Sequence, residues 1–183
     1  MILSSQSIRR LRPVDPFYER TVFNGMSYGL GPNGYDIRIA EDLVIAPYSY
    51  ALASSIERFE MPNNVMARVT DKSTWARRFL SIFNTTIDSG WKGWLTLELV
   101  NHSKDTISIE KGSPIAKIIF EKLDEPTDLE YDGVYQNQRS GPVPAKVQRD
   151  MPLFASHSVR QEQDEYACIC GKRWDVSEGE EHP

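Results

Sequence analysis

The strongest constraint on the fold is the alternation of short apolar segments with turn residues. In residues 94–101, Leu95, Leu97 and Leu99 share one side of an expected strand, and Thr96, Glu98 and Val100 share the other. Further segments rich in β-branched and aromatic side chains are residues 35–39, 50–59 and 65–70. Gly, Pro and Asn stand between these segments, as is typical of turns. The pattern predicts a mainly all-β barrel or sandwich.

Two local signals complete this expected fold. Ser4 predicts the cap of a short N-terminal helix, which ends before Pro13. Residues 106–109 and 115–121, with a Lys-Gly turn between them, predict a β-hairpin.

The composition changes after residue 123. Residues 124–146 are rich in Pro, Gly, Asp and Gln, and the following stretch is polar with two acidic runs. Such segments do not build a core of their own. We therefore expect a β-barrel core at 1–123, residues 124–146 as a segment without a core of its own, and a polar tail at 147–183.

Charge and hydropathy limit the class of function. The formal net charge of -5 argues against broad binding to nucleic acid, because that mode requires a basic surface. No apolar run approaches the roughly 20 residues that span a bilayer, so we expect no membrane partner. The two cysteines, Cys168 and Cys170, are too close together to form a secreted disulfide framework, which favours a cytoplasmic protein.

Residues 71–77 form the first candidate site. Ser73 is expected to cap a single helical turn, whose free N–H groups, together with Lys72, would attract a phosphate. Ser73 and Arg77 are four residues apart and would project from one face of that turn. The alternative is a solvent-exposed capped turn with an arginine on its surface.

Two carboxylates form the second candidate site. Asp88 precedes a Gly-containing turn, and Glu98 lies in the middle of an expected strand, where a charge is costly unless it is paired or neutralised. Partial burial would raise the pKa of Glu98 and a nearby Arg77 would lower it, so Glu98 is a candidate general base. The alternative is an outward-facing Glu98 in a cross-strand ion pair.

Six motifs, taken together, resemble the dCTP deaminase family. They occur in the family's order and cover about residues 1–146. The motifs are MILSSQSIRR at 1–10, GYDIR at 34–38, KSTWAR at 72–77, IDSGWKG at 87–93, LTLELVN at 95–101 and YQNQRSGPVP at 135–144.

The resemblance implies a distorted β-barrel or jelly roll of the trimeric dUTPase type, with active sites where subunits of a homotrimer meet. It also implies that Glu98 takes a proton from the water that attacks C4 of the cytosine of dCTP. Ser73 and Arg77 match the residues that position this water and the base. Asp88 matches the residue that contacts the deoxyribose.

The remaining matched positions bind substrate. Lys72 and Thr74 match triphosphate contacts, and Thr96 and Leu97 match the strand beside the base. Tyr131 and Gln138 match contacts from a C-terminal lid that closes over bound nucleotide. The resemblance implies that Mg²⁺ is bound through the triphosphate of the nucleotide and not by a protein cage.

The sequence speaks against zinc at this active site. Zinc-dependent base deaminases use a His or Cys triad with a Pro-Cys-x-x-Cys run, which this chain does not contain. Cys168 and Cys170 supply half of a zinc knuckle in the tail, and the alternative is a pair of exposed thiols.

The chain also departs from the family pattern. The loop at 78–87 is shorter than in many members and carries Phe79 and Phe83 close to the expected position of the base. These rings either belong to the core or reshape the pocket for a 5-substituted cytosine. Three functions stay open: a dCTP deaminase, a bifunctional enzyme that continues to dUMP and pyrophosphate, and a non-catalytic nucleotide-binding trimer.

Overall fold

The computed structural model describes residues 1–146 and the backbone of residues 165–167 and 173–175. The chain divides into two units, Met1–Pro144 and Ala145–Pro183. The elements of the first unit are α1 (Ser5–Leu11), β1 (Val14–Asp15), β2 (Thr21–Phe23), β3 (Met26–Gly31), β4 (Gly34–Arg38), β5 (Leu43–Ile45), β6 (Tyr50–Glu60), β7 (Val65–Asp71), α2 (Ser73–Ala76), β8 (Leu80–Ile82), β9 (Thr86–Ile87), β10 (Lys92–Asn101), β11 (Ile107–Ile109) and β12 (Pro114–Lys122). In the second unit, β13 (Glu165–Ala167) pairs with β14 (Arg173–Asp175).

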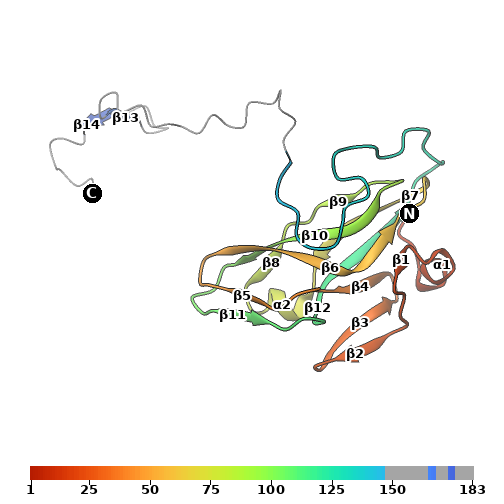
Figure 1. Cartoon of the computed structure of the whole chain (residues 1–183), viewed down its shortest axis with the longest axis horizontal. Helices are drawn as coiled ribbons and strands as arrows, with labels where there is room; N and C mark the ends of the chain where they lie inside the picture. The colour runs from red at the N-terminus through yellow and green to blue at the C-terminus, as the bar shows by residue number, and fades with distance from the viewer. Residues whose placement is uncertain (147–164, 168–172, 176–183) are drawn as a thin grey trace. The chain divides into compact units, whose positions relative to one another are not determined.

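Two sheets build most of the first unit (Figure 1). One has six strands in the order β2-β3-β4-β12-β7-β9, and the other has four in the order β1-β6-β10-β8. An isolated bridge between Ile39 and Ser55 connects them beyond the end of β4. The predicted mainly all-β, jelly-roll-like fold with a short N-terminal helix is confirmed.

One apolar core lies between the sheets, and alternation supplies its side chains. Every second residue of β10 is buried, beginning at Gly93 and ending at Asn101, as the pattern at 94–101 predicts. β7 likewise buries Val65, Ala67 and Val69. Burial of such side chains is worth about 1.5–3 kcal/mol each, so the inward face of every long strand contributes to folding.

One local prediction was wrong, and another was confirmed in position only. Residues 106–109 and 115–121 do not form a hairpin: β11 pairs with β5, and β12 lies between β4 and β7. A local turn signal cannot tell which distant strand a segment will join. Ser4 does occupy the N-cap of α1, but its side chain makes no capping hydrogen bond.

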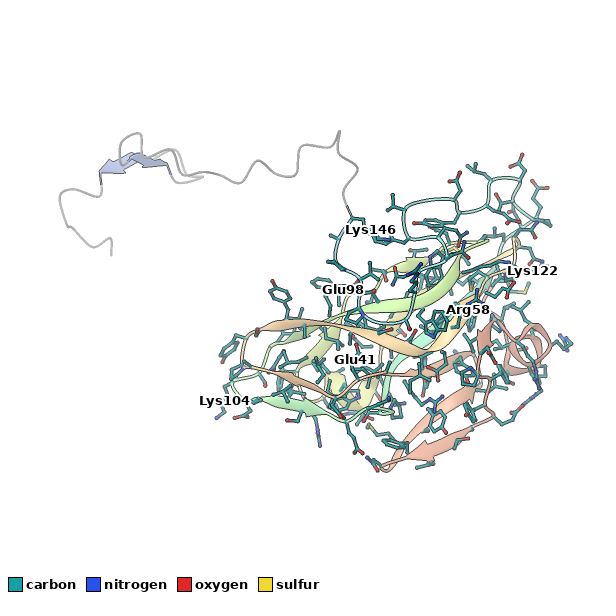
Figure 2. The ribbon with its side chains drawn as sticks, in the orientation of Figure 1. Glu41, Arg58, Glu98, Lys104, Lys122 and Lys146 are labelled. Carbon is teal, nitrogen blue, oxygen red and sulfur yellow. The ribbon has the colours of Figure 1, made fainter. Side chains whose placement is uncertain are left out.

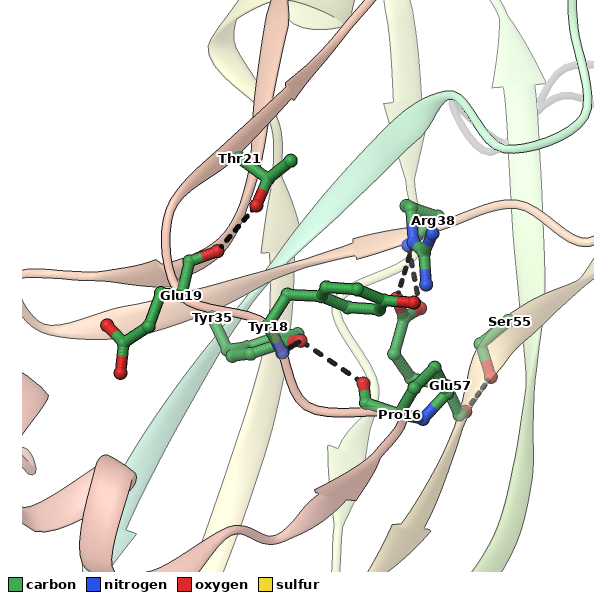
Figure 3. A network of polar contacts seen from close by, with 8 residues as sticks. All are labelled: Pro16, Tyr18, Glu19, Thr21, Tyr35, Arg38, Ser55 and Glu57. Carbon is green, nitrogen blue, oxygen red and sulfur yellow. Dashed lines mark hydrogen bonds and ion pairs between the residues drawn. The ribbon is translucent and has the colours of Figure 1, made fainter.

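A buried ion pair connects the two sheets (Figure 3). Arg38 at the end of β4 donates from Nε to Glu57 Oε1 at 2.8 Å and from its backbone N–H to Oε2 at 2.9 Å, and Glu57 is fully buried. Burial raises the pKa of the Glu57 carboxyl, while Arg38 opposes that shift. The guanidinium also lies over the rings of Tyr18 and Tyr28, with its carbon 4.8 and 4.5 Å from their centroids.

Within the described residues, no helix has the length and apolar character that crossing a membrane requires.

Candidate active site

Glu98 lies on the outward face of the four-stranded sheet (Figure 2). It is paired with Leu52 on β6, and the backbone N–H of Phe83 donates to its carbonyl at 3.0 Å on the other side. Side chains directly opposite each other in antiparallel strands share a face, with Cβ atoms about 4.5–5.5 Å apart. The carboxylate therefore lies in a row between two apolar side chains.

This environment determines the proton affinity of Glu98. The side chain is half-buried, and burial raises its pKa above the ordinary value for a glutamate. Apart from the backbone of Glu98 itself, which lowers the pKa, no group within residues 1–146 forms an ion pair or hydrogen bond with its side chain. The sequence left open a cross-strand ion pair of Glu98. No such pair occurs in this part of the chain, because the residue opposite Glu98 on β6 is the apolar Leu52.

The α2 turn carries three predicted site residues at the surface. Ser73, Thr74 and Arg77 are all exposed, and the Arg77 Nη1 donates to the Ser73 carbonyl at 3.4 Å. Ser73 and Arg77 therefore lie together, as their spacing predicts. The capping prediction was wrong, because Lys72 is the N-cap and Ser73 is the first helical residue.

Two hydrogen bonds hold this turn in place. The indole Nε1 of Trp75 donates to the Pro114 carbonyl at 2.7 Å, which anchors the turn to β12. The carboxylate of Asp71 accepts the backbone N–H of Ile82 at 2.9 Å, which fixes the turn against β8. The surface residues of α2 thus stand on a rigid base.

Lys72 points away from solvent. Its Nζ lies 2.7 Å from Asp36 Oδ2, and both residues are buried. Lys117 Nζ lies 3.6 Å from the other oxygen of Asp36, which accepts no hydrogen bond. The Lys72 ammonium is expected from the sequence to contact a triphosphate. In the single chain it pairs instead with the Asp36 carboxylate of β4.

The C-terminal segment, defined here as residues 131–143, is fastened to β10 and to the turn before it. Gln138 is buried, and its Nε2 donates to the Thr96 hydroxyl at 2.6 Å and to the Trp94 carbonyl at 2.9 Å. The backbone N–H of Val143 also donates to the Thr96 hydroxyl, at 3.0 Å. Thr96 is two residues from Glu98 on the same face, so this segment lies beside the candidate base.

Tyr131 begins that segment. Its backbone N–H donates to the Ser89 carbonyl at 2.9 Å, and its ring packs against the core. Asp88, next to this contact, is exposed. Asp88 and Tyr131 are therefore brought together through the turn at 88–91.

Leu97 differs from the other predicted residues. Its side chain is buried on the inward face of β10, as its place in the alternation requires. Only its backbone lies in the strand beside the expected base.

One predicted group is not assembled within a single chain. No hydrogen bond or ion pair joins Ser73 or Arg77 to Glu98 among the described residues, and Arg77 is not among the causes of the pKa shift of Glu98. The exposed turn with a surface arginine, considered from the sequence, describes α2 in the isolated chain.

The sequence did not single out Leu52 or Gln136 as site residues. A single leucine in a strand, or a single glutamine in an irregular segment, has no periodicity that would mark it. Gln136 accepts from the Lys92 N–H at 2.8 Å and donates to the carbonyls of Gly90 and Tyr131 at 3.0 and 2.6 Å. Of the two alternatives for Phe83, a place in the core is wrong, because its side chain is 59% exposed.

The described residues contain no cluster of three or more His, Cys, Asp or Glu side chains placed to hold a metal ion. Cys168 and Cys170, which could bind zinc in the tail, lie outside the described residues.

Comparisons with known proteins identify the family of this chain. Residues 33–123 match a family described as dCTP deaminase-like. The dCTP deaminase of Thermococcus sibiricus is 31% identical over 154 residues, covering 76% of this chain and 94% of the relative. That of Herpetosiphon aurantiacus is 32% identical and covers 72% and 89%. At this identity and coverage, the chain belongs to the dCTP deaminase family.

Solved structures with similar folds include dUTPases. The EIAV dUTPase has a TM-score of 0.47 at 24% identity, covering 54% of this chain and 82% of its own. The Staphylococcus bacteriophage 80alpha dUTPase has a TM-score of 0.48 at 19% identity, covering 65% and 92%.

Proposed function

We propose that this protein is a hydrolase that deaminates dCTP to dUTP and ammonia, acting on the C–N bond of a cyclic amidine. Family membership gives the substrate class. The observation that carries the proposal is the half-buried Glu98 in its apolar row, with a raised pKa and no cation partner in the described chain. A carboxylate with these properties suits proton transfer near neutral pH.

The chemistry requires one carboxylate to move one proton at a time. Glu98 takes a proton from water as the water oxygen bonds to C4 of the cytosine. Glu98 passes this proton to N3 of the ring, where it stays. Glu98 then moves the remaining proton from the new C4 hydroxyl to the amino group, so that the C4–N bond breaks, ammonia leaves and C4 becomes a carbonyl carbon of the uracil ring. General acid–base catalysis of this kind contributes roughly 10²–10⁴-fold.

The other predicted residues position the reactants in this proposal. Ser73 and Arg77 hold the attacking water and the base, and Asp88 contacts the deoxyribose. Because Ser73 and Arg77 make no contact with Glu98 in one chain, we assign them to the neighbouring subunit of a homotrimer. The cytoplasmic location expected from the sequence belongs to the same proposal.

The remaining contacts bind the phosphates and close the site. Thr74 and Lys72 contact the triphosphate, and Lys72 must then share its ammonium between Asp36 and the ligand. Tyr131 and Gln138 close over the nucleotide. Phosphate oxygens and water would hold Mg²⁺, because this cation keeps several of its waters and the Lys72 ammonium repels it.

The test is to incubate the purified chain with dCTP and Mg²⁺ and to separate the products by chromatography. Ammonia with dUTP supports the proposal. Pyrophosphate with dUMP would reveal a second hydrolytic step, and binding without turnover would show a nucleotide-binding module.

Replacing the base is the sharper form of this test. Glu98→Gln keeps the shape of the side chain and removes its proton affinity, so turnover should fall by at least roughly 10²-fold while calorimetry still detects dCTP binding. Glu60→Gln is the matched control, because Glu60 is an exposed carboxylate that pairs with Lys92. Near-normal turnover of Glu98→Gln would remove Glu98 from the mechanism.

A further inference from the structure

Phe83 is an aromatic side chain exposed on the surface beside the candidate base. It continues the alternation of β8, in which Leu80 and Ile82 are buried and Ser81 faces outward. Its backbone N–H donates to the Glu98 carbonyl, which places the two residues opposite each other. Leu52 lies opposite Glu98 on the other side. A row of Leu52, Glu98 and Phe83 thus crosses β6, β10 and the residue that follows β8.

We propose that Leu52 and Phe83 form the apolar walls of the base-binding site, and that Phe83 selects cytosine rings with an apolar substituent, such as a methyl group, at C5. This inference rests on the proposed function, since it takes Glu98 as the base for attack at C4.

Ring chemistry connects Phe83 to this position. C5 is bonded directly to C4, the atom that water attacks, so a group on C5 lies close to the carboxylate that activates the water. The side chains that flank Glu98 are therefore the ones that such a group would meet. An exposed aromatic ring gains contact area from an apolar substituent, while an unsubstituted ring leaves that area wet.

The register sets Phe83 apart from the neighbouring Phe79. The backbone N–H of His102 donates to the Phe79 carbonyl, so Phe79 lies opposite His102, which is four positions beyond Glu98 and directly follows β10. At about 3.3 Å per residue, this is roughly 13 Å from the Glu98 row. Phe79 is 66% exposed and is therefore a matched control of the same residue type.

The experiment compares kcat/KM for dCTP and 5-methyl-dCTP in the full-length chain and its variants. The unaltered protein should prefer 5-methyl-dCTP by roughly tenfold, the selectivity that one methyl group gives in an apolar pocket. Phe83→Ala should lose this preference, Phe83→Leu should keep part of it, and Phe79→Ala should keep all of it. Equal values for the two nucleotides in the unaltered protein, or the same loss in both phenylalanine-to-alanine variants, would overturn the inference.

A second readout separates a wall of the site from a merely structural ring. In Phe83→Ala, water reaches Glu98 more easily, so the acid limb of the pH–rate profile should move to lower pH. It should stay in place in Phe79→Ala. A change in molar mass by light scattering, with unaltered base selectivity, would instead place Phe83 in a subunit contact and overturn the assignment.

Binding distinguishes this inference from the proposed function. Calorimetry with Glu98→Gln should show tighter binding of 5-methyl-dCTP than of dCTP, and Glu98→Gln combined with Phe83→Ala should abolish the difference. If the unaltered protein turns over neither nucleotide but this difference persists, the proposed reaction fails and the binding site stands. If turnover occurs without the difference, the binding site fails and the reaction stands.

Discussion

Glu98 and Glu60 show how surroundings change the behaviour of the same side chain. Glu60 is exposed, and the hydrogen bond from Lys92 lowers its pKa. Glu98 is half-buried between Leu52 and Phe83, and burial raises its pKa. Both glutamates lie in strands whose burial alternates, so the alternation alone does not distinguish them. Their neighbours do: Glu60 lies opposite Lys92, and Glu98 lies opposite Leu52.

The raised pKa of Glu98 predicts the pH dependence of activity. A general base works in its ionised form, so activity falls as the pH drops through the pKa of Glu98. Because that pKa is raised, the acid limb of kcat/KM should lie above the value of an exposed glutamate, about 4.3. A pH–rate profile measures it directly. An acid limb at or below that value would contradict the assignment of Glu98.

The buried pair predicts a large stability effect at Arg38. Arg38→Ala leaves the Glu57 carboxylate buried without its partner, which costs about 3–5 kcal/mol of unfolding free energy. The matched control is Arg9→Ala, because Arg9 forms an exposed pair with Glu19 and its loss should change stability little. Urea denaturation of both variants measures the difference.

The same substitution should make stability depend on pH. Arg38 lowers the pKa of Glu57 against the effect of burial, so the pKa rises further without it. A carboxyl whose folded pKa exceeds its unfolded value binds more protons in the native state, and stability is lost as the pH rises from about 4.3 through the folded pKa. The Arg38→Ala deficit should therefore grow with pH across this window. A deficit that shrinks with rising pH would contradict this account.

At the scale of elements, the contact between β10 and the C-terminal segment depends on one glycine. Gly93 has φ +147°, and a Cβ there would lie 2.8 Å from both the backbone N and O of Gln138. These atoms are backbone and cannot move aside alone. The parallel bridge between Gly93 and Gln138 is thus possible only without a side chain at position 93.

Gly93→Ala should release the C-terminal segment from β10. The amide of Trp94, which donates to the Gln138 carbonyl at 3.2 Å, should then exchange its hydrogen faster. Hydrogen exchange measured by mass spectrometry or NMR detects this change. Gly25→Ala is the control, because Gly25 also has positive φ but no atom within 4 Å of a Cβ. Equal protection of the Trp94 amide in both variants would show that the contact tolerates a side chain.

Sequence predicts these elements unevenly. The alternation at 94–101 and 65–70 located β10 and β7, because one buried face leaves a period of two in the sequence. The C-terminal segment has no period, and its fastening depends on glutamine side chains and Gly93. The composition of residues 124–146 therefore predicted a segment without a core but not its contacts with β10.

At the scale of the whole molecule, the proposed site residues lie on two elements that no hydrogen bond or ion pair joins through Glu98 in the described chain. Glu98 lies on the outward face of one sheet, and Ser73 and Arg77 lie on the exposed α2 turn. The sequence proposes these residues for one site but does not predict how they come together in space, because assembly depends on surfaces that no sequence period records. We expect light scattering to give three copies of the 20.9-kDa chain.

Mixing two inactive variants tests the assignment of these residues to neighbouring subunits. Glu98→Gln and Ser73→Ala should each be inactive alone, but unfolding and refolding them together should restore activity at roughly a quarter of the sites, where each subunit supplies its intact residue to the same interface. Each variant refolded alone is the control. No recovery in the mixture would place both residues in one chain's site.

The glutamine side chains that hold the C-terminal segment have a chemical consequence of their own. A carboxamide donates only from nitrogen and accepts only at oxygen, and the nitrogen of Gln136 faces two carbonyl oxygens. Hydrolysis of that amide to an acid would set oxygen against oxygen at both contacts. The protein is proposed to replace an amino group by oxygen on its nucleotide. The same replacement at Gln136, as slow chemical ageing of the protein, would loosen the C-terminal segment beside the candidate base.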